Sequence, residues 1–238
     1  MKNNKQSHIR FYEELNDFLP PGKRKQTYEL PLLVRQTVKD LIEAQGVPHT
    51  EVDLILANGE PVEFSYIVKD GDRISVYPKF ESFDISETSN LRKEQLRDIK
   101  FVVDVNLGKL VKYLRLLGFD TYYRNDLEDE EIVEISNKEE RIILTKDLGV
   151  LKRSDVERGY YVRSQDPKEQ LKEVIQRFDL KNDVSPFTIC MECNGKLEKV
   201  DKKEIEDDLL PGTKANYNEF FRCTGCGKIY WKGSHFAR

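Results

Sequence analysis

Acidic residues stand at three separated places in the second half of this chain, and each place adjoins an apolar segment. Asp104 ends the apolar run FVVD, and Asp147 closely follows the apolar run IILT. The third place is the segment NDLEDEEI, which contains Asp129 among neighbouring acids. An ionised carboxylate next to a buried strand is costly unless a partner compensates its charge. The three acids therefore predict a cation site, provided that the fold brings them together.

The chemistry of such a site follows from its ligands. Like charges at short range raise one another's pKa, so a carboxylate cluster is stable at neutral pH mainly when a cation neutralises it. Oxygen ligands favour hard octahedral ions, and we expect Mg²⁺ or Mn²⁺ there instead of zinc. These ions promote attack of water on a phosphodiester, because they lower the pKa of the water and stabilise the leaving oxygen. Supporting positions are Asn106, Asp126, Glu130 and Thr145.

Each acid also has a structural explanation. Asp129 and Glu130 can cap a helix or complement its dipole, and Asp147 can cap the short helix that follows it. Asn106 can either hold a metal-bound water or form a turn. Asp104 ends a buried strand and has no evident capping role. The coincidence of the three places favours a functional site.

The elements around these acids alternate between strands and helices. Strands are predicted at 100–105, 121–125, 141–145 and 160–163, and helices at 107–118, 130–140, 148–153 and 167–178. Such alternation predicts right-handed crossovers and a parallel sheet with helices on both faces. Ligands of these sheets bind beyond the carboxyl ends of the strands, where Asp104 and Asp147 are expected.

The first 80 residues follow a different pattern. We predict strands at 8–15 and 26–30, a helix within 36–48, and strands within 53–62 and 72–78. Two strands, a helix and two more strands are typical of the β-grasp or ubiquitin-like fold. The polar segment that follows has no strand pattern and predicts a linker.

The four cysteines form two Cys-x-x-Cys pairs, Cys190 with Cys193 and Cys223 with Cys226. A glycine follows each pair within two residues, so the backbone can turn back towards the thiolates while four sulfur atoms complete a tetrahedral zinc site. A redox dithiol is the alternative, but it would need only one pair. Four thiolates leave no open coordination position, so this Zn²⁺ would be structural and would stabilise a segment with little apolar core.

Composition limits the possible functions. The chain has 238 residues, of which 34% are charged, and its formal net charge of -4 gives no overall positive field, so any nucleic-acid contact must be local. The N-terminal residues lack the apolar core of a signal peptide, and no window reaches the length of a membrane span. We expect a cytoplasmic protein without membrane association.

Two segments resemble known families. The run from FVVDVN to LTKDLGVLKR resembles the Mut-seven C-terminal RNase domain, a branch of the PilT N-terminal (PIN-like) nucleases, and the resemblance covers nearly all of residues 100–238. The segment VKDLIEAQGVPH and the residues after it resemble small sulfur-carrier proteins, and more closely a ubiquitin-like domain fused to certain RNases. Sulfur carriers act through a free Gly-Gly terminus, whereas this chain continues, so a docking or structural module is expected, with a protein partner as one possibility.

The RNase resemblance implies that Asp104, Asp129 and Asp147 bind the catalytic ions of a metal-dependent ribonuclease that cleaves RNA, with single-stranded RNA as the expected substrate. This chain has Lys146 in LTKD where the family commonly has arginine, and Ile189 before the first cysteine where arginine is frequent. Two alternatives stay open: a non-catalytic RNA-binding adaptor, and metal-dependent nucleotide transfer at RNA ends by the same site.

Basic and aromatic residues near the acids and the cysteines are candidates for RNA contact, through phosphates and unpaired bases. They are Lys109, Lys112, Arg115, Lys146, Arg153, Trp231, Lys232 and His235. Arg115 lies among apolar residues and is predicted to bind a phosphate or to form an internal ion pair. An ordinary solvated helix face explains Lys109 and Lys112 equally well.

The predicted organisation is a multidomain chain of α+β and α/β parts. We assign residues 1–80 to a β-grasp domain, 81–98 to a linker, 99–183 to a PIN-like domain with three α/β/α layers, and 184–238 to a zinc ribbon.

Overall fold

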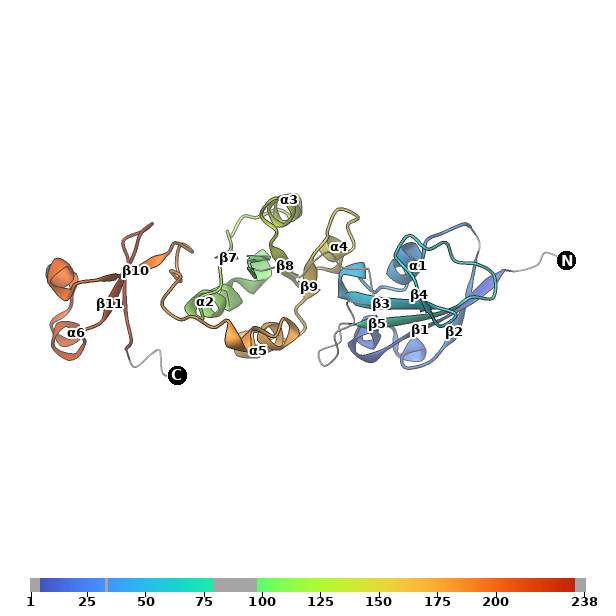
Figure 1. Cartoon of the computed structure of the whole chain (residues 1–238), viewed down its shortest axis with the longest axis horizontal. Helices are drawn as coiled ribbons and strands as arrows, with labels where there is room; N and C mark the ends of the chain where they lie inside the picture. The colour runs from blue at the N-terminus through green and yellow to red at the C-terminus, as the bar shows by residue number, and fades with distance from the viewer. Residues whose placement is uncertain (1–4, 33, 79–97, 234–238) are drawn as a thin grey trace.

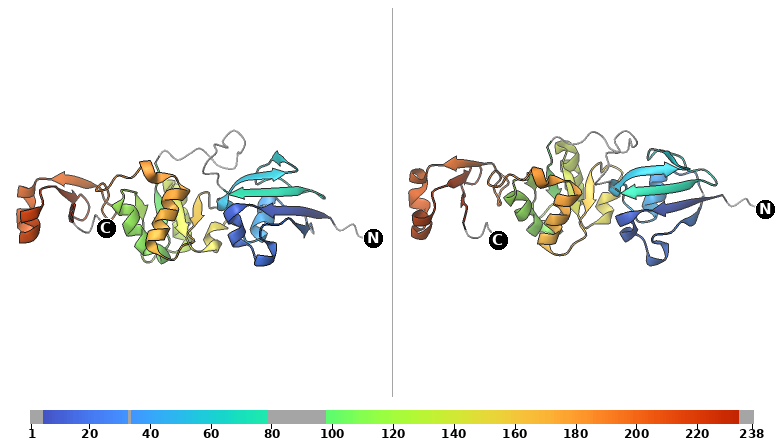
Figure 2. Two further views of the ribbon diagram at one scale, coloured as in Figure 1. Left: turned by 90° about the horizontal axis from the view of Figure 1, so that it is seen from below. Right: turned by 60° about the horizontal axis from the view of Figure 1, so that its bottom comes forward.

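The computed structural model describes residues 5–32, 34–78 and 98–233, which form three units along the long axis of the molecule (Figure 1). An N-terminal sheet unit lies at one end, an α/β unit in the middle and the cysteine-containing unit at the other end (Figure 2). Except for Asp98, the predicted linker lies outside the described residues, as does His235. No helix within these ranges is long and apolar enough to cross a membrane.

The N-terminal unit is a five-stranded mixed sheet with the order β2-β1-β5-β3-β4. Its elements are β1 (Gln6–Phe11), η1 (Glu13–Phe18), η2 (Pro21–Lys23), β2 (Tyr28–Pro31), α1 (Val38–Ala44), η3 (His49–Glu51), β3 (Val52–Ala57), β4 (Glu60–Pro61) and β5 (Arg73–Pro78). β1 is antiparallel to β2 and parallel to β5. Ile42 of α1 lies in one buried cluster with Ile9 of β1 and Val76 of β5. The predicted order of strands and helix is confirmed.

The first strand is shorter than predicted. β1 ends at Phe11, and a 3-10 helix follows where the prediction continued the strand to residue 15. Glu13 has a φ of 44°, which no strand can accommodate. Leu15 then enters the core and is fully buried. The apolar residues of HIRFYEEL thus enter one core from a strand and from a 3-10 helix. The alternation of apolar and polar residues alone does not distinguish this arrangement from one continuous strand.

The central unit is a four-stranded sheet with the order β7-β6-β8-β9, in which all neighbouring strands are parallel. Its elements are β6 (Phe101–Val103), η4 (Val105–Leu107), α2 (Gly108–Leu116), β7 (Thr121–Tyr122), α3 (Asp129–Glu139), β8 (Ile142–Thr145), α4 (Leu148–Leu151), β9 (Gly159–Tyr161), α5 (Pro167–Arg177) and η5 (Leu180–Asn182). One apolar cluster joins α2 and α5 to one face of the sheet, and another joins α3 and α4 to the opposite face. The predicted three-layer arrangement is confirmed.

The C-terminal unit is a small antiparallel sheet beside the cysteines. It consists of β10 (Leu197–Val200), η6 (Lys202–Asp208), α6 (Pro211–Asn216), β11 (Phe220–Cys223) and β12 (Ile229–Trp231), with β11 in the middle. Its buried cluster is small and contains Phe187, Cys190, Cys223 and Tyr230. So small an apolar core fits the expectation that bound metal stabilises this unit.

The N-terminal unit contacts the central unit through η3, which lies against the edge strand β9. Glu51 is 1% exposed, and its Oε1 atom accepts a hydrogen bond of 2.7 Å from the backbone N–H of Tyr161. Its Oε2 atom pairs with Nη2 of Arg163 at 3.2 Å. His49 adds a contact of 2.8 Å between its Nε2 atom and the carbonyl oxygen of Val156. These contacts occupy a sheet edge that would otherwise expose unpaired backbone groups.

We expect replacement of Glu51 by alanine to destabilise the chain by about 2–3 kcal/mol, because it leaves the Tyr161 N–H and the Arg163 guanidinium without their buried acceptor. Urea unfolding measures the change. Glu60→Ala, an exposed position on β4, is the matched control and should change stability by less than about 0.5 kcal/mol. Equal effects of the two substitutions would refute the assigned role of Glu51.

Candidate functional site

Asp104 lies directly after β6, in the middle of the central sheet, and only 5% of its surface is exposed. Its Oδ2 atom accepts a hydrogen bond of 2.6 Å from Oγ1 of Thr145, the last residue of β8. β6 and β8 pair in parallel with Val103 opposite Leu144, so their carboxyl ends meet at one rim of the sheet. The neighbouring strand therefore orients the Asp104 carboxylate.

Asp147 follows β8 at the same rim and is the N-cap of α4. Its Oδ1 atom accepts a hydrogen bond of 2.6 Å from the N–H of Gly149. Its own N–H donates to Oγ1 of Thr145 at 2.8 Å, so the Thr145 hydroxyl links Asp147 to Asp104. The capping explanation for Asp147 is thus confirmed. The cap uses one carboxylate oxygen and leaves the other for a further ligand.

Asp129, the first residue of α3, shares this electrostatic environment. Partial burial raises the pKa of its carboxyl group, and the negative charges of Asp147, Asp104 and Glu130 raise it further, whereas Arg153 lowers it. The charges of the three acids therefore oppose one another, although they are 18 or more residues apart in the sequence. A cation at this rim would relieve that repulsion.

Other acids cap α3. The side chain of Glu128 accepts from the backbone of Glu131, while the side chain of Glu131 accepts from the backbone of Glu128, which makes a reciprocal capping box. Acids in the first turn still complement the helix dipole. A cap, however, does not account for Asp129.

The predicted supporting residues differ in their partners: two form ion pairs with arginines, and the others form hydrogen bonds near the acids. Glu130 pairs with Arg153 at 3.0 Å, and Asp126 pairs with Arg124 at 3.0 Å. The backbone N–H of Asn106 donates to Oδ1 of Asp104 at 3.4 Å, so Asn106 contributes to the turn that the sequence left as an alternative. Asp104 is thereby the N-cap of η4, which corrects the expectation that it has no capping role. Arginines thus already neutralise the outer acids. Thr145 is the predicted supporting residue that joins two acids.

The donor set at the rim suits a hard divalent ion, because it consists of carboxylates whose charges raise the pKa of Asp129. Within the described ranges, however, the cysteines form the only group of three or more His, Cys, Asp or Glu ligands that is gathered closely enough to hold a metal. The acids share an edge of the sheet without forming a closed cage. The Mg²⁺ or Mn²⁺ site stays a prediction.

The cysteine site has the geometry of a four-thiolate centre. The four Sγ atoms lie within 4.8 Å of one another, with 3.6 Å between Cys190 and Cys226 and 3.4 Å between Cys193 and Cys223. A side chain at Gly195 would place its Cβ 3.0 Å from Sγ of Cys223, which explains the glycine after the first pair. The cluster is consistent with a structural Zn²⁺ site.

The thiols differ in their tendency to ionise. Burial raises the pKa of Cys190, but hydrogen bonds from the Tyr230 hydroxyl and from the backbone outweigh it and lower this pKa to about 6. The pKa of Cys193 rises to about 12, because burial and the neighbouring thiols disfavour another negative charge. Full ionisation of the cluster therefore requires a cation, as a zinc ion provides.

Arg115 joins the first cysteine pair to the central unit. This residue of α2 is 5% exposed, and its Nη1 atom donates to the carbonyl oxygens of Met191 and Glu192 at 3.2 and 2.7 Å. Its Nε and Nη2 atoms donate to the carbonyl oxygen of Thr121 at 3.0 and 2.8 Å. Burial lowers the pKa of Arg115 although the nearby cysteines and acids oppose this effect. The side chain thus binds the loop between the cysteines to strand β7.

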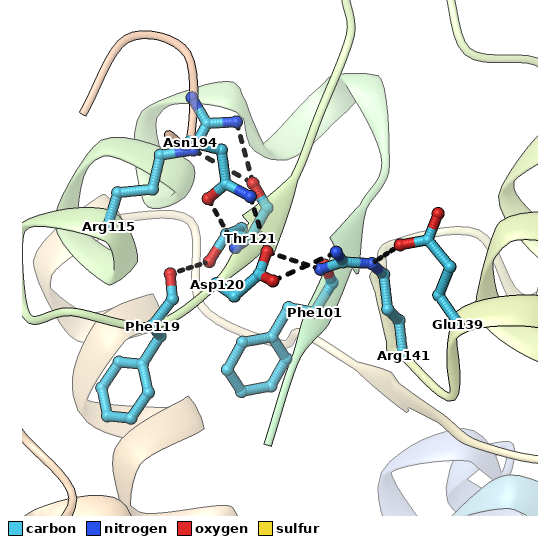
Figure 3. Close-up of polar contacts among 8 residues, drawn as sticks. All are labelled: Phe101, Arg115, Phe119, Asp120, Thr121, Glu139, Arg141 and Asn194. Atoms are coloured by element: carbon cyan, nitrogen blue, oxygen red, sulfur yellow. Dashed lines mark hydrogen bonds and ion pairs between the residues drawn. The ribbon is translucent and has the colours of Figure 1, made fainter. Parts of the chain in front are cut away.

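Asn194 extends this connection into the sheet (Figure 3). Its Oδ1 atom accepts from the N–H of Thr121 at 2.9 Å, and its Nδ2 atom donates to Asp120 at 2.5 Å. Asp120 pairs with Arg141 at 2.7 Å, and Arg141 also donates to the carbonyl oxygen of Phe101 in β6 at 3.1 Å. A continuous polar network therefore runs from the cysteine loop to β6.

The predicted phosphate contact of Arg115 does not fit this position. Its donors are bound to carbonyl oxygens inside the protein, so a phosphate cannot reach them without disrupting the unit. Arg115 is internal, as the alternative expected, but its hydrogen-bond partners are neutral carbonyl oxygens instead of the charged partner of an ion pair. Sequence reasoning missed Asp120, Arg141 and Asn194. Two features of the sequence could have indicated this network: Arg115 within an apolar run, and Asn194 directly after CMEC.

The remaining RNA-contact candidates differ in availability. Lys109 and Lys112 are exposed on α2. The Nζ atom of Lys146 lies 3.4 Å from the carbonyl oxygen of Arg163. Arg153 forms ion pairs with Glu130 and with Asp155.

In the C-terminal unit, Lys232 lies 3.6 Å from Glu219, and Trp231 packs at 6.3 Å between ring centroids from both Tyr217 and Phe220. Trp231 keeps part of its surface exposed. RNA contact by these residues stays a prediction.

Removal of zinc is expected to unfold the C-terminal unit, because the binding free energy of a structural zinc, about 10 kcal/mol or more, exceeds what so small a core supplies. The chain should contain one zinc per molecule, and a chelator should shift the emission of Trp231, its single tryptophan, towards that of a solvated indole. Zn²⁺, but not Mg²⁺, should restore the signal. A native emission spectrum after complete zinc removal would contradict this expectation.

Asp129→Asn is expected to stabilise the zinc-loaded chain at neutral pH when no Mg²⁺ or Mn²⁺ is present. An aspartate with a raised pKa in the folded state binds its proton more tightly when folded, so its contribution to stability is present at low pH and is lost as the pH rises through the folded pKa. Asparagine removes the repulsion that then remains. Because most of the Asp129 side chain is exposed to solvent, which screens the repulsion, the gain should stay below about 1 kcal/mol.

Thermal unfolding from about pH 3 to pH 7 measures this difference, which should vanish at the acid end. Glu134→Gln, an exposed position on the same helix, is the matched control. A gain of equal size in both variants would indicate general charge reduction instead of repulsion at the rim.

These features define a chain with a parallel α/β unit, acids at the carboxyl ends of its strands, and a four-cysteine unit after it. A family model described as Mut7-C RNAse domain matches residues 99–238, and a second, described as Mut7-C ubiquitin, matches residues 4–84. The chain therefore belongs to the Mut7-C RNase family and carries a ribonuclease domain preceded by a ubiquitin-like domain. The searches of curated proteins and of solved structures found no match. The predicted family resemblance is confirmed for both parts of the chain.

Proposed function

We propose that this chain hydrolyses phosphodiester bonds of single-stranded RNA at the rim formed by Asp104, Asp129 and Asp147. The observation that carries the proposal is the Thr145 hydroxyl, which links Asp104 to the Asp147 backbone at the paired ends of β6 and β8. The pKa of Asp129, raised in part by both other acids, supports a shared role. Family membership supports RNA as the substrate.

Each acid has a distinct part in the proposed site. Asp104 is buried and oriented by Thr145, so it is the rigid ligand of a divalent ion. Asp147 offers the oxygen that its cap leaves unused, and Asp129 approaches from the start of α3. When bound, Mg²⁺ or Mn²⁺ supplies an activated water and neutralises charge on the phosphate. Asp126 and Glu130 are held in ion pairs with Arg124 and Arg153, and we assign them a supporting role.

A cleavage assay tests the proposal. End-labelled single-stranded RNA is incubated with the zinc-loaded full chain, with Mn²⁺ or Mg²⁺ either added or omitted. Omission is preferable to a chelator, which would also remove the zinc. Hydrolysis should depend on the added ion and should leave a phosphate on one product end and a hydroxyl on the other. Binding without cleavage under all ions would favour an RNA-binding adaptor, and extension of RNA ends would favour nucleotide transfer.

A further inference from the structure

The C-terminal unit contains a hollow of about 540 Å³ that adjoins the second cysteine pair and is separate from the acidic rim. Its lining comes from η6 and α6, from the second cysteine pair and from strands β11 and β12. A volume of this size lies within the range of about 300–1,000 Å³ that is typical of small-ligand sites.

The register of the sheet explains how the hollow forms. Arg222 pairs with Ile229 across β11 and β12, and Phe220 pairs with Trp231, so these four side chains share one face. Phe220 is fully buried at the inner part of this face. Arg222, Ile229 and Trp231 line the hollow together with Leu209, Leu210 and Asp208 from the opposing segment.

The lining of the hollow combines apolar, aromatic and charged side chains. Leu209 and Ile229 are apolar walls, and Trp231 adds an aromatic surface. Leu210 is 73% exposed and is one of two large apolar side chains exposed among the described residues. Arg222 is exposed and has no side-chain partner within the described part of the chain.

We propose that this hollow binds an unpaired nucleobase of the RNA substrate. The base would lie between the apolar walls and the Trp231 indole, because any base can stack on an aromatic side chain. Arg222 would bind the attached phosphate, which a guanidinium recognises through two parallel hydrogen bonds. Asp208 would accept from an amino group of the base. The proposal rests on the proposed function in that RNA is the ligand, but it assigns a binding site separate from the acids.

Trp231 is the single tryptophan of the chain, so its fluorescence reports on the hollow directly. We would titrate the zinc-loaded full-length Asp104→Asn variant with a labelled single-stranded pentanucleotide, following Trp231 emission and the anisotropy of the label. Binding should quench Trp231 in a saturable manner at the concentrations that raise the anisotropy. Arg222→Ala should weaken this binding about five- to twentyfold, as expected for loss of a phosphate contact.

The matched control is Lys199→Ala, which also removes one exposed positive charge but lies on β10 opposite Phe221, on the other face of the small sheet. It should leave the affinity within about twofold, since a distant charge acts only through a screened field. Zinc content establishes that both variants are folded. If both substitutions weaken RNA binding equally, or if RNA raises the anisotropy of the label without changing Trp231 emission, the proposed base site is wrong.

The outcome is separable from the proposed function. Saturable quenching that depends on Arg222, in a chain whose wild type does not cleave RNA, would retain the base site and refute the nuclease. Metal-dependent cleavage by a wild type whose Trp231 emission does not respond to bound RNA would support the nuclease and refute the base site.

Discussion

Asp104→Asn is expected to lower the rate of RNA cleavage by at least about a hundredfold, because in the proposed site Asp104 would bind the catalytic ion and the substitution removes its charge. The size of the side chain is unchanged, and the amide oxygen can still accept the hydrogen bond from Thr145. RNA affinity should therefore stay within about twofold, since phosphate contacts and stacking dominate it. Single-turnover cleavage and binding anisotropy measure the two effects separately.

The matched control for Asp104→Asn is Glu134→Gln, which removes one negative charge from an exposed position on α3. Its cleavage rate should stay within about threefold of the wild-type rate, as expected for a distant, screened charge. A variant at Asp104 that cleaves as fast as this control would remove the acidic rim from the mechanism. The ribonuclease activity would then have to arise elsewhere in the chain.

Replacement of Arg115 by methionine should destabilise the chain by about 3 kcal/mol or more, because it leaves three carbonyl oxygens without their buried donor. The affected carbonyls belong to Met191, Glu192 and Thr121. Since two of them lie in the cysteine loop, the loss should appear as earlier release of zinc during denaturation. Urea unfolding with a colorimetric zinc indicator measures both transitions.

Lys112→Met is the control for Arg115→Met. Lys112 lies three residues earlier on α2 and is exposed, so the substitution should change stability by less than about 0.5 kcal/mol. The same pair addresses RNA binding: if Lys112 contacts phosphate, its variant should weaken RNA affinity while its stability is retained. Similar stability in both variants would show that Arg115 does not hold the cysteine loop.

The network around Arg115 has a consequence for zinc. Asn194, directly after the first cysteine pair, donates to Asp120 and accepts from the backbone of Thr121. Bound zinc would fix the loop that presents Asn194, and this loop supplies a hydrogen-bond partner for β7. We therefore expect zinc loss to destabilise β7 and, through it, the neighbouring strand β6. Asp104 of the acidic rim directly follows β6.

Much of the fold and of the site was predictable from local patterns. Continuous apolar runs such as FVV and IILT predicted buried parallel strands, and they are buried along their whole length. The acids after those runs predicted a shared rim, because parallel strands end at one edge of a sheet. The spacing of four cysteines predicted a cluster of sulfur ligands, and these atoms do gather. Each pattern depends on neighbours in sequence or on one regular repeat.

The tertiary structure decided what depends on distant partners. It placed Thr145 against Asp104, and it turned Arg115 inward to carbonyl oxygens 76 and 77 residues away. It also seated Glu51 on the edge of β9. A basic or acidic side chain has the same local signature whether it faces solvent or a buried partner. Its role is fixed only when folding removes water and supplies a particular donor or acceptor, because the cost of leaving that group unpaired then selects one arrangement.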